Sequence, residues 1–71
     1  MTVLHLLKGD PTLAMDVIAS QVAAGDAVTV ALLEGDPPPL PAAVIVRRVD
    51  ADLSYGELVD LMFAAEHVVT W

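Results

Sequence analysis

The chain has 71 residues, enough for one small domain over residues 1–71. Hydrophobic residues make up 56% of it, too many for a disordered tail. It has no cysteine, which excludes a disulfide scaffold, a thiol nucleophile and a cysteine-bound zinc site. A net charge of −7 disfavours direct contact with nucleic acid. With no targeting or membrane-spanning segment visible, we expect a cytoplasmic location.

The first part of the chain predicts a strand, a helix and a second strand. Residues 3–7 (VLHLL) form a short apolar run typical of a strand buried on both faces of a parallel sheet. Asp10 is a candidate helix cap, and Pro11 suits the first helical position. Apolar residues recur at helical spacing through residues 12–24, and residues 27–33 (AVTVALL) predict another buried strand.

A proline-rich segment separates the second strand from the third. Residues 34–41 (EGDPPPLP) fit neither a helix nor an inner strand, and residues 42–49 predict strand three. A stiff polyproline bridge is long enough to run back along the sheet, which would make strand three parallel to strand two. An antiparallel hairpin is the competing interpretation.

The last part of the chain predicts a helix and a final strand. Ser54 and Glu57 have the spacing of a capping box. The helix that follows has an apolar stripe, and we expect Met62 and Phe63 beside it to lie in the core. Residues 67–71 (HVVTW) predict strand four.

The element order β-α-β-β-α-β predicts an α/β fold: a small, mainly parallel four-stranded sheet with one helix on each face. With strand order 3-2-1-4 or 2-1-3-4, right-handed crossovers place the two helices on opposite faces. One helix covers roughly two strands, so about half of each face would stay bare. Bare apolar sheet is an association surface, so we expect an oligomer, most simply a dimer.

Both ends of the chain resemble the DsrH/TusB family of sulfur-relay proteins. The resemblance lies in Val3-Leu4-His5-Leu6-Leu7 with Gly9-Asp10-Pro11, in Ala24-Gly25-Asp26, in Ser54-Tyr55-Gly56-Glu57-Leu58-Val59, and in the closing Val68-Val69-Thr70-Trp71. The middle, around Pro37 to Pro41, is shorter than in the family.

This resemblance implies a DsrE/DsrF/DsrH-like fold and a place in assemblies that pass persulfide sulfur towards tRNA thiolation or sulfur oxidation. In such assemblies the sulfur-carrying cysteine lies on the DsrE-type partner, and the DsrH-type subunit is mainly structural. A chain without cysteine fits the structural role, because a persulfide forms on a thiolate. The implied partners are DsrE/DsrF-type subunits, or a second copy in a homo-oligomer.

Three groups of residues are candidates for ligand binding or chemistry. His5 lies on the expected central strand, either as a ligand or proton donor or as a buried histidine bonded to a backbone carbonyl. Lys8 and Asp10 lie at the carboxyl end of that strand, where open α/β sheets bind ligands, although Asp10 would place its own carboxylate at the helix start.

The third group is a charged cluster after strand three. Arg47, Arg48, Asp50 and Asp52 form either a desolvated acid–base pair, a partner-docking edge or a solvated set of ion pairs. Trp71 is either a core plug or an interface residue.

These residues leave three functional hypotheses. The first is a non-catalytic, DsrH-like interaction subunit. The second is an anion-binding or small-molecule-binding regulatory module that uses Lys8 and Asp10. The third is a small enzyme that uses His5 with Asp50 and Asp52. We adopt the first, with no enzyme activity, cofactor or metal expected.

Overall fold

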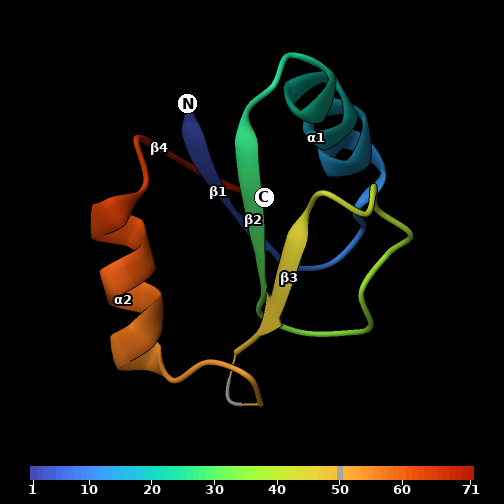
Figure 1. Ribbon diagram of the computed structural model, residues 1–71. Coiled ribbons are helices and arrows are strands. Elements are labelled where there is room, and N and C mark those ends of the chain that lie inside the picture. The colour runs from blue at the N-terminus through green and yellow to red at the C-terminus, as the bar shows by residue number, and fades with distance from the viewer. Residues whose placement is uncertain (50) are drawn as a thin grey trace.

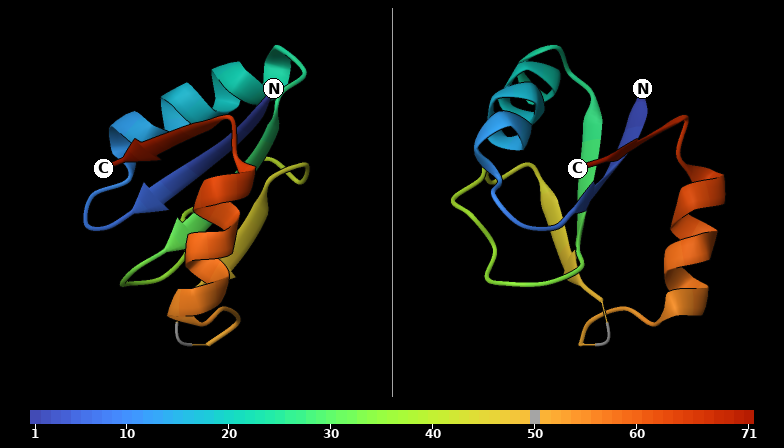
Figure 2. Two further views of the ribbon diagram at one scale, coloured as in Figure 1. Left: turned by 90° about the vertical axis from the view of Figure 1, so that its left-hand side faces the viewer. Right: turned by 180° about the vertical axis from the view of Figure 1, so that it is seen from behind.

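The elements of the fold follow the expected order. The computed structural model describes residues 1–49 and 51–71. Its elements are β1 (Thr2–Leu7), α1 (Thr12–Ala23), β2 (Ala27–Leu32), β3 (Ile45–Arg48), α2 (Tyr55–Ala64) and β4 (His67–Thr70). The strands form one sheet in the order β3-β2-β1-β4, and every neighbouring pair is parallel. The helices lie on opposite faces of this sheet (Figures 1 and 2), as predicted.

The two central strands, β1 and β2, hold most of the core. The β1 side chains from Val3 to Leu7 are all buried, as a strand covered on both faces requires. One core cluster, which includes Leu7, Ile18 and Val30, lies on the α1 face, and another, which includes Leu4 and Leu58, lies on the α2 face. The expectation that half of each face stays bare is therefore wrong for the central strands.

The proline-rich crossover explains part of this difference. It returns the chain so that β3 runs parallel to β2, which confirms the bridge and excludes the hairpin. Leu40 and Val44 of this crossover pack against the α1-face cluster. The crossover therefore shields sheet that a helix would otherwise have to cover. It also leaves β3 shorter than expected, because a turn closed by the Val44 amide on the Pro41 carbonyl (3.0 Å) precedes the strand.

Helix α1 begins after a turn in which Asp10, the residue before the N-cap, bonds Thr12. The Asp10 carboxylate accepts hydrogen bonds from the Thr12 amide (3.0 Å) and from the Thr12 hydroxyl (2.6 Å). Pro11 stands at the N-cap position, one residue earlier than predicted. Ala14 and Ile18 are the buried residues of the helix, and Gly25, with φ 89°, follows its end in the left-handed conformation that glycine tolerates.

Helix α2 begins with the predicted capping box. Leu58 is its buried residue, and Leu61 and Ala65 pack partly against the α2-face cluster. The expectation that Met62 and Phe63 lie in the core is wrong, because the side chains are 38% and 87% exposed respectively. Hydrophobic residues occupy most sides of this helix, so more than one stripe fits the helical period.

The total surface is normal for the size of the chain, and several large apolar side chains remain on it. The accessible area is 4307 Å², against about 4,250 Å² expected for a compact monomer of this mass. Large apolar side chains that remain exposed include Leu13 and Val17 on α1, Val59, Met62 and Phe63 on α2, and Ile45 and Val68 on the two edge strands. Neither helix in the described ranges has the length and apolar content needed to cross a membrane.

Candidate functional site

His5 is the one buried polar side chain among the described residues, and it joins β1, α1 and the C-terminus. It is fully buried, and its Nε2 lies 2.6 Å from Oε1 of Gln21 on α1. The indole Nε1–H of Trp71 donates to His5 Nδ1 at 2.9 Å. The two ring planes are 17° from parallel, and their centroids are 6.1 Å apart. We call these three residues the His5 triad.

The His5 triad fixes the protonation pattern of the imidazole. An indole nitrogen only donates, so Nδ1 of His5 accepts and carries no hydrogen. The hydrogen then lies on Nε2 and is donated to Gln21 Oε1. Both ring nitrogens are therefore occupied by protein partners, and neither is positioned to bind a ligand or exchange a proton with a substrate. The predicted burial of His5 is confirmed, but the predicted backbone-carbonyl partner is wrong, because the side chains of Gln21 and Trp71 bond the ring.

The Lys8 and Asp10 end of β1 is a helix start rather than a prepared anion site. Both residues are exposed. The Asp10 carboxylate is held at the first turn of α1 by Thr12. The hydroxyl and amide hydrogen bonds from Thr12 hold the pKa of Asp10 below its ordinary value. A carboxylate at this position repels the anion that the second functional hypothesis requires.

The charged cluster after β3 lies apart from the His5 triad. The Arg48 guanidinium contacts Asp36 at 3.4 Å and the Gly35 carbonyl at 3.3 Å, whereas the Asp52 carboxylate accepts from the Arg48 main-chain amide at 3.2 Å. Arg48 and Asp52 are exposed, as is Arg47. Asp50 lies outside the described residues. The structure therefore does not bring Asp52, on an exposed turn, together with His5, which is closed inside the core.

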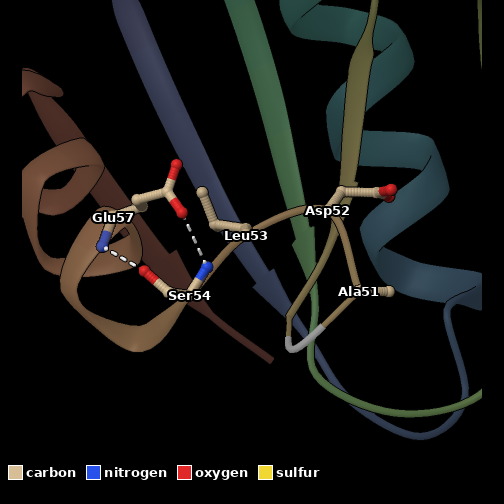
Figure 3. A pocket seen from close by; sticks show the side chains of 5 residues that line it. All are labelled: Ala51, Asp52, Leu53, Ser54 and Glu57. Carbon is tan, nitrogen blue, oxygen red and sulfur yellow. Dashed lines mark hydrogen bonds between the residues drawn. The ribbon is translucent and has the colours of Figure 1, made fainter.

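A shallow hollow of about 330 Å³ lies at the start of α2, lined by Ala51, Asp52, Leu53, Ser54 and Glu57 (Figure 3). Ser54 Oγ accepts from the Glu57 amide (3.2 Å), and Glu57 Oε1 accepts from the Ser54 amide (3.1 Å). The Asp52 side chain points away from Glu57 (Figure 3). The Ser54 and Glu57 side chains of the hollow therefore cap the helix, and Asp52 bonds the Arg48 amide. Within the described residues no group of three His, Asp or Glu side chains is placed to hold a metal ion.

The open edge of β4 has a different character. β4 has β1 on one side only, and its C-terminal neighbour Trp71 donates its amide to the Leu6 carbonyl (3.0 Å). Residues 67–71 include no Asp, Glu, Lys or Arg. Val68 is 38% exposed on the α2 face of the sheet. Trp71 packs partly against the α1-face cluster, so its side chain contributes to the core from the end of an edge strand.

Apolar side chains of both helices flank this edge. On α2, Leu61 and Ala64 line a small crevice with Thr29 of β2. The helical period therefore turns Met62 and Val59, on the opposite flank, towards β4. On α1, Gln21 reaches the His5 triad, and Val17, one turn earlier, lies on the same flank. We call β4 with Val17, Val59 and Met62 the β4 edge surface.

The chain matches no protein-family model, no curated protein and no solved structure in the three comparisons made.

Two features of these sites were missed at the level of sequence. Gln21 and Trp71 stand 16 and 66 residues from His5, and no local pattern connects them. The exposure of Phe63 was missed because an apolar residue in an apolar helix gives no signal of the side on which it lies. The sequence does distinguish the two edge strands. Residues 67–71, which form β4 and its C-terminal neighbour, include no Asp, Glu, Lys or Arg, whereas β3 carries Arg47 and Arg48.

Proposed function

We propose that this chain is a non-catalytic interaction subunit that acts by assembly with other protein subunits in the cytoplasm. The observation that carries the proposal is the set of large apolar side chains on the outer sides of the helices, above all Phe63, 87% exposed, and Leu13, 71% exposed. Val59, Met62 and Phe63 are exposed neighbours on one helix, α2, and apolar side chains exposed side by side in a small domain are typical of a protein-binding face.

The closed His5 triad supports the non-catalytic part of the proposal. A general acid or base needs a ring nitrogen within reach of the substrate, and both nitrogens of His5 are taken by Gln21 and Trp71. The resemblance of the chain ends to the DsrH/TusB family suggests the kind of assembly. We propose a sulfur-relay complex in which a cysteine-bearing DsrE/DsrF-type subunit carries the persulfide and this chain supports it.

Sedimentation with candidate partners tests this proposal. The chain is mixed with cysteine-bearing DsrE/DsrF-type proteins encoded by the same organism, and a stable complex is expected. The variant Phe63→Ser should weaken the complex, whereas Asp60→Ser, an exposed polar position on the same helix, should not. After incubation with a persulfide-loaded partner, mass spectrometry should find no sulfur added to this chain. The sulfur-relay assignment fails if no such partner binds.

A further inference from the structure

We infer that the β4 edge surface binds a second copy of this chain, through antiparallel pairing of β4 with β4 of the copy. This inference rests on the proposed assembly role and names one surface and one partner for it. An edge strand presents unpaired main-chain groups that another strand can satisfy. The hydrogen-bond register of β4, its lack of charge and the apolar side chains beside it all favour a second β4 as the strand that pairs with this edge.

The register of β4 makes its free edge self-complementary. Main-chain groups of alternate residues point to opposite edges of a strand. Trp71 donates to β1, and Val69 pairs with His5 of β1, so Val68 and Thr70 point their amides and carbonyls to the open edge. When two such strands are related by a twofold axis at Val69, Val68 of each copy lies opposite Thr70 of the other. All four outward amides then find carbonyl acceptors.

Charge favours this edge as the meeting place of two copies. Each copy carries a net charge of −7, so contact between most surfaces opposes like charges. Residues 67–71 include no Asp, Glu, Lys or Arg, and their one titratable side chain is His67, counted as neutral in the net charge of −7. The nearby Glu66 carboxylate accepts from the Thr2 amide at 3.1 Å. The opposite edge differs, because β3 carries Arg47 and Arg48, the type of charged residue that blocks edge pairing.

The flanks complete the contact on both faces of the sheet. A twofold axis through Val69 brings α1 beside α1 of the copy and α2 beside α2. On the α2 face, Met62, Val59 and Val68 of both copies fill the strip above the paired strands. On the α1 face, Val17 and the exposed part of Trp71 do the same. The pairing therefore buries apolar side chains that the single chain leaves 38% to 46% exposed.

Two matched lysine variants test the surface. Val68 and Ile45 both lie on the α2 face, one on each edge strand, and they are 38% and 51% exposed. We expect the unmodified chain to sediment as a dimer across a concentration series. Val68→Lys should raise the dimer dissociation constant by about tenfold or more, because each pairing edge then carries a charge. Ile45→Lys should leave the constant within about twofold, since β3 lies outside the contact.

Two cysteine variants test the register in a chain that has no cysteine of its own. In the inferred pairing Val69 faces Val69 of the copy as a non-hydrogen-bonded pair, with Cα atoms about 4.5 Å apart, within disulfide range. Under mild oxidation Val69→Cys should therefore form a covalent dimer. Thr70→Cys should not, because the two Thr70 residues are diagonal neighbours about 7–8 Å apart.

Three results would overturn the inference: a monomer at every concentration, equal loss of the dimer in both lysine variants, or faster cross-linking of Thr70→Cys than of Val69→Cys. These failures are distinct from failure of the proposed function. A monomer that still binds a DsrE/DsrF-type protein rejects the second copy and keeps the assembly role. A dimer that binds no such protein keeps this inference and rejects the sulfur-relay partner.

Discussion

Replacing Trp71 with phenylalanine isolates the indole hydrogen bond of the His5 triad. Phenylalanine keeps an aromatic ring that can pack at the edge of the α1-face cluster, but it removes the donor that lies 2.9 Å from His5 Nδ1. Because His5 is fully buried, no solvent replaces this donor. A buried acceptor left without a partner costs about 1–3 kcal/mol, so we expect Trp71→Phe to lower the free energy of unfolding by about 2 kcal/mol.

This loss is large for a chain of this size. At about 0.05–0.15 kcal/mol per residue, 71 residues give a total of about 4 to 11 kcal/mol. The variant should therefore melt about 8–16 °C below the unmodified chain. The measurement is urea unfolding followed by circular dichroism, because Trp71 is the only tryptophan and its fluorescence is lost in the variant. Protein concentration is held fixed, since self-association shifts the apparent stability.

Tyr55→Phe is the matched control for this prediction. It also removes one polar group from an aromatic side chain, but Tyr55 is 64% exposed. The control should change the free energy of unfolding by no more than about 0.5 kcal/mol. If Trp71→Phe is equally neutral, the indole hydrogen bond does not stabilise the core and our account of the His5 triad is wrong.

Three further predictions concern the core and the helix caps. Ile18→Ala should cost about 2–5 kcal/mol in urea unfolding because the side chain is fully buried, whereas Leu13→Ala, at a position 71% exposed, should cost about 0.5 kcal/mol or less. Ser54→Ala should cost about 1 kcal/mol, since it removes the acceptor for the Glu57 amide; a cost near zero would show that the capping box is unimportant. The lowered pKa of Asp10 gives stability that is present above its unfolded-state pKa and lost as pH falls through its native pKa. Asp10→Asn should therefore destabilise the chain at neutral pH and have less effect in acid, and an equal effect at both would contradict this.

The sequence predicts the sheet well because burial leaves a local signature. Residues 3–7 are apolar without alternation, and only a strand covered on both faces accepts such a run. The proline segment was informative for a similar reason, since its stiffness limits the paths by which it returns to the sheet. These signals depend on neighbouring residues, so they can be read along the chain.

The surface and the His5 triad depend on contacts that no local pattern encodes. About half of each sheet face was expected to be bare because helices alone were counted as cover, whereas Leu40 and Val44 of the crossover also pack on the α1 face. The partners of His5 come from a helix and from the end of the chain. The buried side of α2 is set by Leu58, Leu61 and Ala65, and a helix apolar on most sides does not reveal that choice.

The position of Trp71 links the stability of the fold to the inferred pairing of β4. Its amide continues the hydrogen-bond ladder to β1, and its indole ties the end of the strand to His5. The strand that faces the second copy is therefore held at one end by the His5 triad. Val68→Lys should weaken pairing without lowering the stability of the single chain, because the side chain is already partly in water. Trp71→Phe should lower both the stability of the single chain and the affinity of pairing. The less ordered β4 of the variant has to be ordered again when the copy binds. If Trp71→Phe lowers stability and leaves pairing unchanged, β4 is not the strand that the copy contacts.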